Sequence, residues 1–302
     1  MKAIITGGSG FVGQNLVPYL EKEKYETVIL NRQQLQEVTV GQLNEVAIVI
    51  HLAGKAHDLK KTADPNSYYQ INYEITKKLY DVFLESKAKK FVFISSVKAV
   101  ADSVVGSLTE DETPQPKTDY GKSKLMAEEY IRSQPLPTGK SFYILRPCMI
   151  HGPGNKGNLN LLYKFVKKGI PYPLAAFANK RSFLSVTNLC FVIAELLKKP
   201  IESGIFNVAD DEPLSTNQVI NVLAEASNIK PKLWHIPIAA IKFLAKMGDL
   251  LHLPLTTERL QKLTENYVVD NSKIKKELHL QLPITTKEGL ILTVESFATP
   301  IN

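Results

Sequence analysis

The chain has 302 residues, of which 44% are apolar and 22% charged, so it can bury a substantial core as one large or two modest domains. The formal net charge of +7 favours an acidic small molecule as partner and not nucleic acid, because the basic residues are scattered among acids and form no stripe with aromatic residues. Cys148 and Cys190 show neither metal-ligand nor redox spacing, so we expect no disulfide and no metal site.

The first half of the chain alternates short β-rich runs with helical stretches. Strands are predicted at 3–6, 26–30, 47–53, 91–95 and 142–146, and helices at 11–22, 67–86, 119–133 and 158–168. Continuous apolar strands separated by helices indicate a parallel sheet covered on both faces, that is, a Rossmann-type doubly wound α/β fold. The polar stretch between the second and third strands has weak periodicity, which predicts that the intervening unit is cut short.

After residue 150 the alternation gives way to loops rich in proline and glycine. A strand is predicted near IFNVAD, and helices are predicted near 216–227, 238–250 and 285–298. We therefore expect a doubly wound domain over 1–155, to which segments near 180–208 return, and a smaller C-terminal α+β lobe over 156–302 that binds substrate.

The longest apolar stretch, 236–254, is interrupted by Lys242, Lys246 and Asp249, which a membrane-spanning helix would have to bury. The stretch is predicted to be a core or dimer helix, and an amphipathic helix at a membrane surface is the alternative. The start MKAIITGG lacks the features of a secretory signal. We expect a cytoplasmic protein without a transmembrane segment, most simply a homodimer.

The first predicted strand runs directly into TGGSGFVGQNL, which opens a helix. Glycines at this position permit a tight turn and let backbone N–H groups approach a pyrophosphate at the helix N-terminus. The pattern predicts dinucleotide binding by the residues of this turn, namely Gly7, Gly10, Phe11, Val12 and Gly13.

The end of the second strand reads VILNR, where an acidic residue would bind both ribose hydroxyls of NAD. Asn31 and Arg32 stand there instead, and a guanidinium suits a 2′-phosphate. We therefore predict NAD(P) as cofactor, with NADP(H) favoured over NAD; the alternative is that Arg32 points to water.

The segment YGKSKLMAEE places Tyr120 four positions before Lys124, so that both side chains lie on one face of a helix. Ser96 ends the strand FVFISS at the sheet edge where such folds bind ligands. An ordinary tyrosine is almost entirely protonated at pH 7, and a neighbouring ammonium is expected to lower its pKa. Ser96, Tyr120 and Lys124 are therefore predicted to converge over a nicotinamide.

These motifs together resemble the extended short-chain dehydrogenase/reductases that act on nucleotide sugars, and within them a UDP-glucose 4-epimerase-like subgroup of bacterial polysaccharide pathways. The resemblance covers nearly the whole chain. Its motifs, in order, are TGGSGFVG, HLAGKAH, INYEIT, FVFISS, DYGKSKLMAE, LRPCMIHGPGNKGN, RSFLSVTNL, FNVAD, VVDNSKIKKEL and TTKEGL.

The resemblance implies a role for each matching residue. Tyr120 would transfer the proton at the sugar C4 hydroxyl, Lys124 would hold the nicotinamide ribose, and Ser96 would bind the same sugar oxygen. Asn72 would order the helix beneath the active site. Further cofactor contacts would come from Leu52, Ala53, Gly54 and Pro147. The substrate diphosphate would be held by Asn158 and Arg181, with a second cation from Lys262 or from Arg259.

Some features depart from the family pattern. The sequence VKAVAD replaces the Val-Tyr-Gly that many relatives carry after the serine, and no Asp-Glu pair follows Ser96, so dehydration is disfavoured. Three hypotheses remain: a 4-epimerase of a UDP-hexose or UDP-N-acetylhexosamine for surface polysaccharide, an NADPH-dependent 4-keto-sugar reductase, and a non-catalytic nucleotide-binding protein of the same fold.

Overall fold

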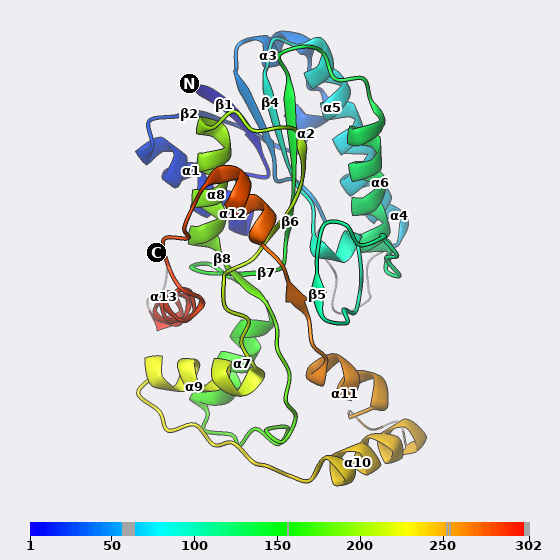
Figure 1. Ribbon diagram of the computed structural model, residues 1–302, viewed down its shortest axis with the longest axis vertical. Coiled ribbons are helices and arrows are strands. Elements are labelled where there is room, and N and C mark those ends of the chain that lie inside the picture. The colour runs from blue at the N-terminus through cyan, green and yellow to red at the C-terminus, as the bar shows by residue number, and fades with distance from the viewer. Residues whose placement is uncertain (56–63, 156, 252, 254, 299–302) are drawn as a thin grey trace.

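The computed structural model describes residues 1–55, 64–155, 157–251, 253 and 255–298. Its main sheet has six strands in the order β2-β1-β3-β4-β6-β9, all of them parallel (Figure 1). The strands are β1 (Lys2–Thr6), β2 (Glu26–Leu30), β3 (Ile48–His51), β4 (Lys90–Ile94), β6 (Ser141–Pro147) and β9 (Gly204–Val208). The predicted Rossmann-type α/β fold is confirmed. The strand order reverses between β1 and β3, which is where such sheets bind ligands.

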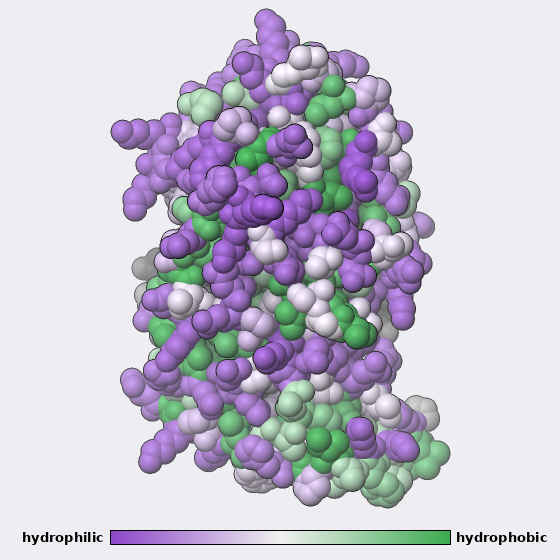
Figure 2. All heavy atoms as spheres, in the orientation of Figure 1, coloured by the Kyte–Doolittle hydropathy of each residue, from purple (hydrophilic) through white to green (hydrophobic). Residues whose placement is uncertain are grey.

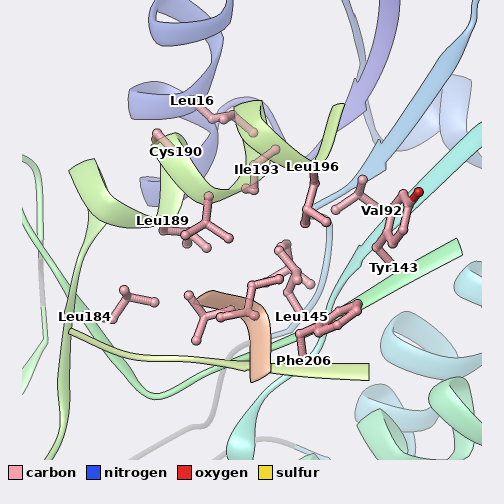
Figure 3. Close-up of a cluster of buried hydrophobic side chains, with 14 of the residues drawn as sticks. Leu16, Val92, Tyr143, Leu145, Leu184, Leu189, Cys190, Ile193, Leu196 and Phe206 are labelled. Carbon is pink, nitrogen blue, oxygen red and sulfur yellow. The ribbon is translucent and has the colours of Figure 1, made fainter. Parts of the chain in front are cut away.

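Helices cover both faces of this sheet. One face packs against α1 (Phe11–Lys22), α8 (Val186–Lys198) and α12 (Ser272–Leu278). The other packs against α2 (Arg32–Gln36), α3 (Val40–Asn44), α5 (Ile75–Glu85) and α6 (Asp119–Ser133). Successive strand residues point to opposite faces, so Val92 enters the first core and Phe93 the second. Figure 3 shows the first core, where Leu16 and Leu189 from two helices face Val92 and Leu145 from the sheet.

Several elements differ from the sequence-based expectation, and the helices Thr257–Thr264 and Ser272–Leu278 were not predicted. The unit between β2 and β3 is indeed short, but it forms two capped turns of helix, α2 and α3, each closed by a reciprocal capping box. Helix α8 was not predicted, although its sequence has a narrow helical stripe: Thr187, Phe191, Glu195 and Lys198 are the positions of the helix that are not buried, and they lie on one side. The predicted helix 67–86 is divided into α4 (Asn66–Tyr68), a π-helical turn (Tyr69–Glu74) and α5.

A second group of elements lies beyond the carboxyl ends of the strands, in the lower half of Figure 1. Its helices are α7 (Asn158–Lys167), α9 (Thr216–Ala226), α10 (Ile238–Leu251), α11 (Thr257–Thr264) and α13 (Thr286–Ala298). Two short parallel ladders accompany them, β5 (Ser107–Leu108) with β10 (Val268–Val269), and β7 (Met149–His151) with β8 (Phe183–Ser185). The helices predicted near 216–227, 238–250 and 285–298 are present. The domain boundary at 155 stays a prediction.

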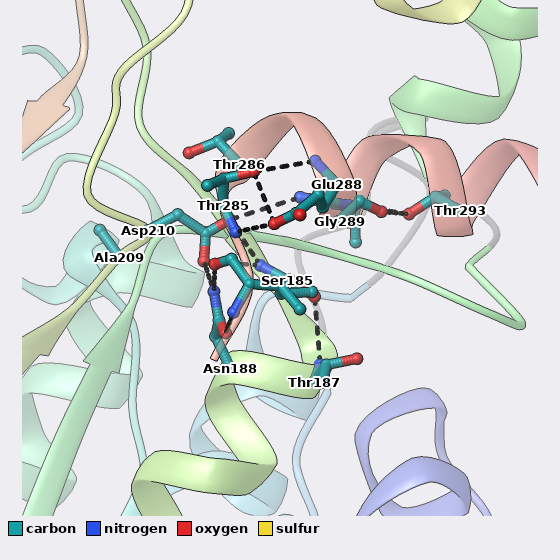
Figure 4. A network of polar contacts seen from close by, with 12 residues as sticks. Ser185, Thr187, Asn188, Ala209, Asp210, Thr285, Thr286, Glu288, Gly289 and Thr293 are labelled. Atoms are coloured by element: carbon teal, nitrogen blue, oxygen red, sulfur yellow. Dashed lines mark hydrogen bonds and ion pairs between the residues drawn. The ribbon is translucent and has the colours of Figure 1, made fainter. Parts of the chain in front are cut away.

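A buried polar network joins the two groups of elements (Figure 4). The Asp210 carboxylate accepts hydrogen bonds from the backbone N–H of Ser185 at 3.0 and 3.1 Å and from Asn188 Nδ2 at 2.7 Å. Asn188 Nδ2 also donates to the carbonyl of Ile284 at 2.9 Å. Because Ser185 caps α8 and Ile284 precedes α13, the network fixes the start of both helices.

Candidate active site

The turn after β1 has no room for side chains at two of its glycines. Gly7 has a φ of +71°, and a Cβ atom on it would lie 2.6 Å from the backbone nitrogen of Ala53. A Cβ atom on Gly13 would lie 2.5 Å from the carbonyl oxygen of Gly7. Gly10 caps α1, so the N–H groups of its first turn, at Phe11, Val12 and Gly13, have no partner within the helix. This turn is a cradle in which backbone N–H groups can hold the diphosphate of a dinucleotide.

The end of β2 places Asn31 and Arg32 at the surface. The Asn31 side chain caps α2 by accepting a hydrogen bond from the backbone N–H of Gln34 at 2.9 Å. Arg32 is the first residue of α2, and its side chain is exposed. The Asn31 side chain is therefore engaged in capping α2, while the exposed Arg32 guanidinium can reach a ligand at this edge of the sheet.

The segment after β3 is held between β1 and the π-helical turn. The Ala53 backbone N–H donates to Thr6 Oγ1 at 3.1 Å. A Cβ atom on Gly54 would lie 3.0 Å from both Asn72 Oδ1 and Lys124 Nζ. Gly54 therefore lets the chain pass directly above these two groups, with Leu52 and Ala53 just before it.

Asn72 lies in the π-helical turn and is completely buried. Its Oδ1 accepts the backbone N–H of Lys55 at 2.7 Å, and its Nδ2 donates to the carbonyl of Lys55 and to Ser123 Oγ, both at 3.1 Å. Asn72 thus fastens the segment after β3 to α6, which carries Tyr120 and Lys124. A π-helical turn at such a position is typical of functional sites.

The structure brings Ser96, Tyr120 and Lys124 together at the carboxyl end of β4. A side-chain hydrogen bond joins Ser96 to Tyr120. Lys124 Nζ donates to the carbonyl of Ile94 at 2.9 Å and lies 4.8 Å from the centre of the Phe93 ring. Because α6 begins at Asp119, capped by Thr118, both functional side chains extend from its first two turns.

The pKa of Tyr120 lies above its ordinary value, which is opposite to the direction expected from the sequence. Burial raises this pKa, and the hydrogen bond from Ser96 lowers it by less. Burial also lowers the pKa of Lys124 to about 8, against a smaller raising effect of Glu128. At pH 7 the phenol is therefore protonated and ready to donate, and the ammonium is still mostly charged.

A buried ion pair beneath Lys124 was missed in the sequence. Glu128, one helical turn after Lys124, accepts from Arg146 Nε at 3.1 Å and from Arg146 Nη2 at 2.5 Å. Ser95 also donates to Glu128. The signal was available, because Tyr120, Lys124 and Glu128 are each four positions apart and so share one face of α6.

The predicted substrate residues come together only in part. Arg181 lies beside α11, where its Nη2 donates to the carbonyl of Lys262 and is 3.8 Å from Glu265 Oε1. The Lys262 ammonium instead pairs with Glu258 at 2.6 Å on the outside of α11. Asn158 begins α7, but its side chain lies outside the described residues. Pro147 is buried as the last residue of β6.

The immediate surroundings of Tyr120 are aromatic. Tyr68, which the sequence did not single out, packs edge-on against Tyr120 with ring centres 6.2 Å apart. This contact forms one wall beside the phenol. The structure has no cluster of three or more His, Cys, Asp or Glu side chains able to hold a metal ion within its described ranges.

Comparison with known proteins finds similar sequences over nearly the whole chain. Residues 3–209 match the model of the NAD dependent epimerase/dehydratase family. The UDP-glucose 4-epimerase of Vibrio cholerae is 30% identical over 322 aligned residues, which cover 99% of this chain and 96% of that protein. The N-acetyl-alpha-D-glucosaminyl-diphospho-ditrans,octacis-undecaprenol 4-epimerase of Escherichia coli O157:H7 is 29% identical over 290 residues, covering 90% of this chain and 84% of that protein.

Among solved structures, the fold is similar to that of the Thermus thermophilus UDP-glucose 4-epimerase in complex with NAD. The TM-score is 0.76 at 23% identity, and the match covers all of both chains. This likeness concerns the fold, and it extends through the second group of elements.

Proposed function

The chain belongs to the NAD dependent epimerase/dehydratase family, and from that premise we propose that it is an NAD(P)-dependent enzyme acting at C4 of a UDP-hexose or UDP-N-acetylhexosamine, as a 4-epimerase. The observation that carries the proposal is the hydrogen-bonded pair of Ser96 and Tyr120, with Lys124 one turn further along the same helix. These groups lie at the same sheet edge as the glycine turn after β1.

The residues of the first half fit a dinucleotide. Gly7 and Gly13 leave the space that its diphosphate needs, and the start of α1 supplies N–H donors. When bound, the nicotinamide supplies a site that accepts and returns hydride. Lys124 would hold its ribose, next to the chain at Gly54.

The protein's own part in the reaction is proton transfer and orientation. Tyr120 would take the proton from the C4 hydroxyl as hydride leaves, and return it when hydride comes back on the other face of the sugar. Ser96, hydrogen-bonded to the phenol, would hold the same C4 oxygen. The nearby charge of Lys124 would favour the phenolate in the half-reaction in which Tyr120 acts as base. Arg181 would bind the diphosphate of the substrate.

One observation favours a second candidate, an NADPH-dependent 4-keto-sugar reductase. Burial keeps Tyr120 protonated, which suits a group that only donates its proton. The exposed Arg32 at the end of β2 suits a 2′-phosphate. Both activities use the same residues, so the cofactor balance must separate them.

The test is to incubate the protein with UDP-glucose, UDP-N-acetylglucosamine and the matching UDP-4-keto sugars, with and without NADPH. Conversion without consumption of added cofactor supports the epimerase, and stoichiometric loss of NADPH supports the reductase. No reaction with any of them would support a nucleotide-binding protein without this activity.

Tyr120→Phe is expected to lower turnover by roughly 10²–10⁴-fold, because it removes the proton-transfer group and leaves the ring in place. Tyr130→Phe is the matched control: Tyr130 lies on the same helix and donates to Asp81, away from Ser96. Equal activity of Tyr120→Phe and the parent protein would contradict the proposed mechanism.

Cofactor choice has its own test at Arg32. Arg32→Ser is expected to weaken NADPH binding by about tenfold or more, because a charge-assisted hydrogen bond is lost, and to leave NADH binding unchanged. Fluorescence titration with both nucleotides measures this. Equal affinity losses for both would show that Arg32 does not contact the 2′-phosphate.

The sugar carrier is a separate question. Since one relative acts on a sugar attached to undecaprenol diphosphate, the substrate panel should include a polyprenyl-diphosphate N-acetylhexosamine. Turnover of that compound in preference to the UDP-sugars would move the proposal to a lipid-linked substrate, with surface polysaccharide synthesis as the pathway.

A further inference from the structure

Helix α10 exposes most of its apolar side chains. Ile241 and Ala245 pack with Leu174 and Leu260 in a small core, and Gly248 is buried on the same side of the helix. Several large side chains point outward: Phe243 is 64% exposed and Leu250 is 72% exposed. Leu244 and Leu251 on the helix, and Leu253 two residues after its end, are about half exposed. We call these five outward-facing residues the α10 face.

The α10 face is a concentrated patch and not a set of scattered residues. Eight of the sixteen exposed large hydrophobic side chains in the described part of the chain lie between positions 234 and 263. Figure 2 shows apolar residues gathered at the end of the molecule where Figure 1 places α10. An exposed patch of this kind marks an interaction site.

The packing behind α10 prevents its apolar face from turning inward. A Cβ atom on Gly248 would lie 1.7 Å from the carbonyl oxygen of Leu255, so the returning chain touches the helix backbone. Asp249 accepts hydrogen bonds from the backbone N–H and the hydroxyl of Thr257. The outward direction of Phe243 and Leu250, seven positions apart and so on the same side of the helix, is thereby fixed.

Positive charge borders the patch. Lys242 and Lys246, four positions apart on the flank of α10, are exposed and form no ion pair within the described residues. Between positions 230 and 263 the sequence has six lysine and arginine residues against two carboxylates. One of those carboxylates, Asp249, accepts hydrogen bonds from Thr257.

An apolar face bordered by lysines favours a lipid surface over a second copy of the chain as the binding partner. Two copies meeting through the α10 face would bring lysines of like charge together, and lysine is depleted in the cores of protein interfaces. At an anionic bilayer the lysines can reach the headgroups while the apolar residues enter the acyl boundary. Among the described helices none is long and apolar enough to cross a membrane, so the contact would be peripheral.

We propose that the α10 face, with Lys242 and Lys246, docks the protein on the surface of an anionic lipid bilayer. Docking would place the second group of elements against the membrane and leave the six-stranded sheet in the aqueous phase. The proposal does not depend on which sugar the enzyme converts.

The test is sedimentation of the full-length protein with sucrose-loaded vesicles of phosphatidylglycerol and phosphatidylcholine, compared with phosphatidylcholine alone. We expect binding to the anionic vesicles that weakens at high salt. Phe243→Ser with Leu250→Ser is expected to lower the partition coefficient by more than about tenfold, because apolar burial is lost. Lys242→Ser with Lys246→Ser is expected to lower it by roughly 25-fold, about fivefold for each lysine.

Leu161→Ser is the matched control, because Leu161 is 65% exposed on α7 and lies outside the α10 face. It should leave vesicle binding unchanged. Absence of binding by the parent protein would overturn the proposal, as would equal binding by the Phe243 and Leu250 double variant. Light scattering adds a third outcome: a dimer that the double variant converts to monomer, without vesicle binding, would overturn the proposal and assign the face to a second copy.

Discussion

Two glutamates on helices of this protein form ion pairs of nearly the same length, one buried in the interior and the other exposed to water. Glu128 lies 2.5 Å from Arg146, and both side chains are almost completely buried beneath Lys124. Glu258 lies 2.6 Å from Lys262, and both are more than half exposed on α11. The distances are equivalent, so the energetic difference between the pairs must come from the solvent around them.

The largest effect is expected when the buried pair is broken. Glu128→Ala leaves Arg146 charged and without its partner in the interior, which should lower the free energy of unfolding by about 3–5 kcal/mol. Urea denaturation measures this loss. The double variant Glu128→Leu with Arg146→Met removes both charges and is expected to regain most of it. A loss below about 1 kcal/mol for Glu128→Ala would mean that water reaches this pair.

His51 is a third titratable group with which to measure the effect of burial that separates the two ion pairs. His51 is completely buried between Thr6 and Thr76, with hydrogen bonds of 2.6 and 2.9 Å to their hydroxyls. Burial, with a smaller effect of Lys124, lowers its pKa from 6.5 to about 3. Between these values the unfolded chain binds the extra proton, so the folded state loses stability as the pH falls below about 6.5.

The expected slope from His51 approaches about 1.4 kcal/mol per pH unit. His51→Asn keeps a donor and an acceptor but does not titrate, so its free energy of unfolding should depend less steeply on pH between about 6 and 4. Chemical denaturation of both proteins at several pH values isolates the difference. Parallel curves would show that His51 is not held neutral in the folded protein.

The smallest effect is expected at the exposed pair. Lys262→Ala should change the free energy of unfolding by no more than about 0.5 kcal/mol, because water and salt screen this contact within one helix. The same variant tests the role implied for Lys262 at the substrate. An unchanged KM would fit the position of its ammonium on Glu258, whereas a large rise in KM would show that it leaves Glu258 for the substrate.

Local patterns predicted the elements that position the first half of the site. Helices α1 and α6 have the predicted bounds, because a glycine turn and a threonine cap mark their starts. The spacing of Tyr120 and Lys124 gave their common face. It did not give the direction of the tyrosine pKa, because that depends on how deeply the phenol is buried, and burial is set by distant segments such as the one around Tyr68.

The features that the sequence did not predict arise from contacts between remote parts of the chain. Arg146 reaches Glu128 from a neighbouring strand, and Arg181 reaches α11 across more than eighty positions of sequence. Helix α8 packs against the sheet and α1 with nine of its thirteen residues buried, so that only the narrow face of Thr187, Phe191, Glu195 and Lys198 remains outside the core. Sequence periodicity indicates which side of an element meets water, and it does not indicate which remote residue the other side contacts.

The π-helical turn at Tyr69–Glu74 allows one continuous helix to serve two partners that a regular helix could not match. Its wider winding inserts one extra residue, so the side chains before it are rotated relative to those after it. Tyr68 on one side meets Tyr120 in the site, while Leu79 and Phe83 on the other side stay seated in the core. Removal of a single residue here would therefore rotate Tyr68 away from Tyr120 for as long as Leu79 and Phe83 keep their places in the core.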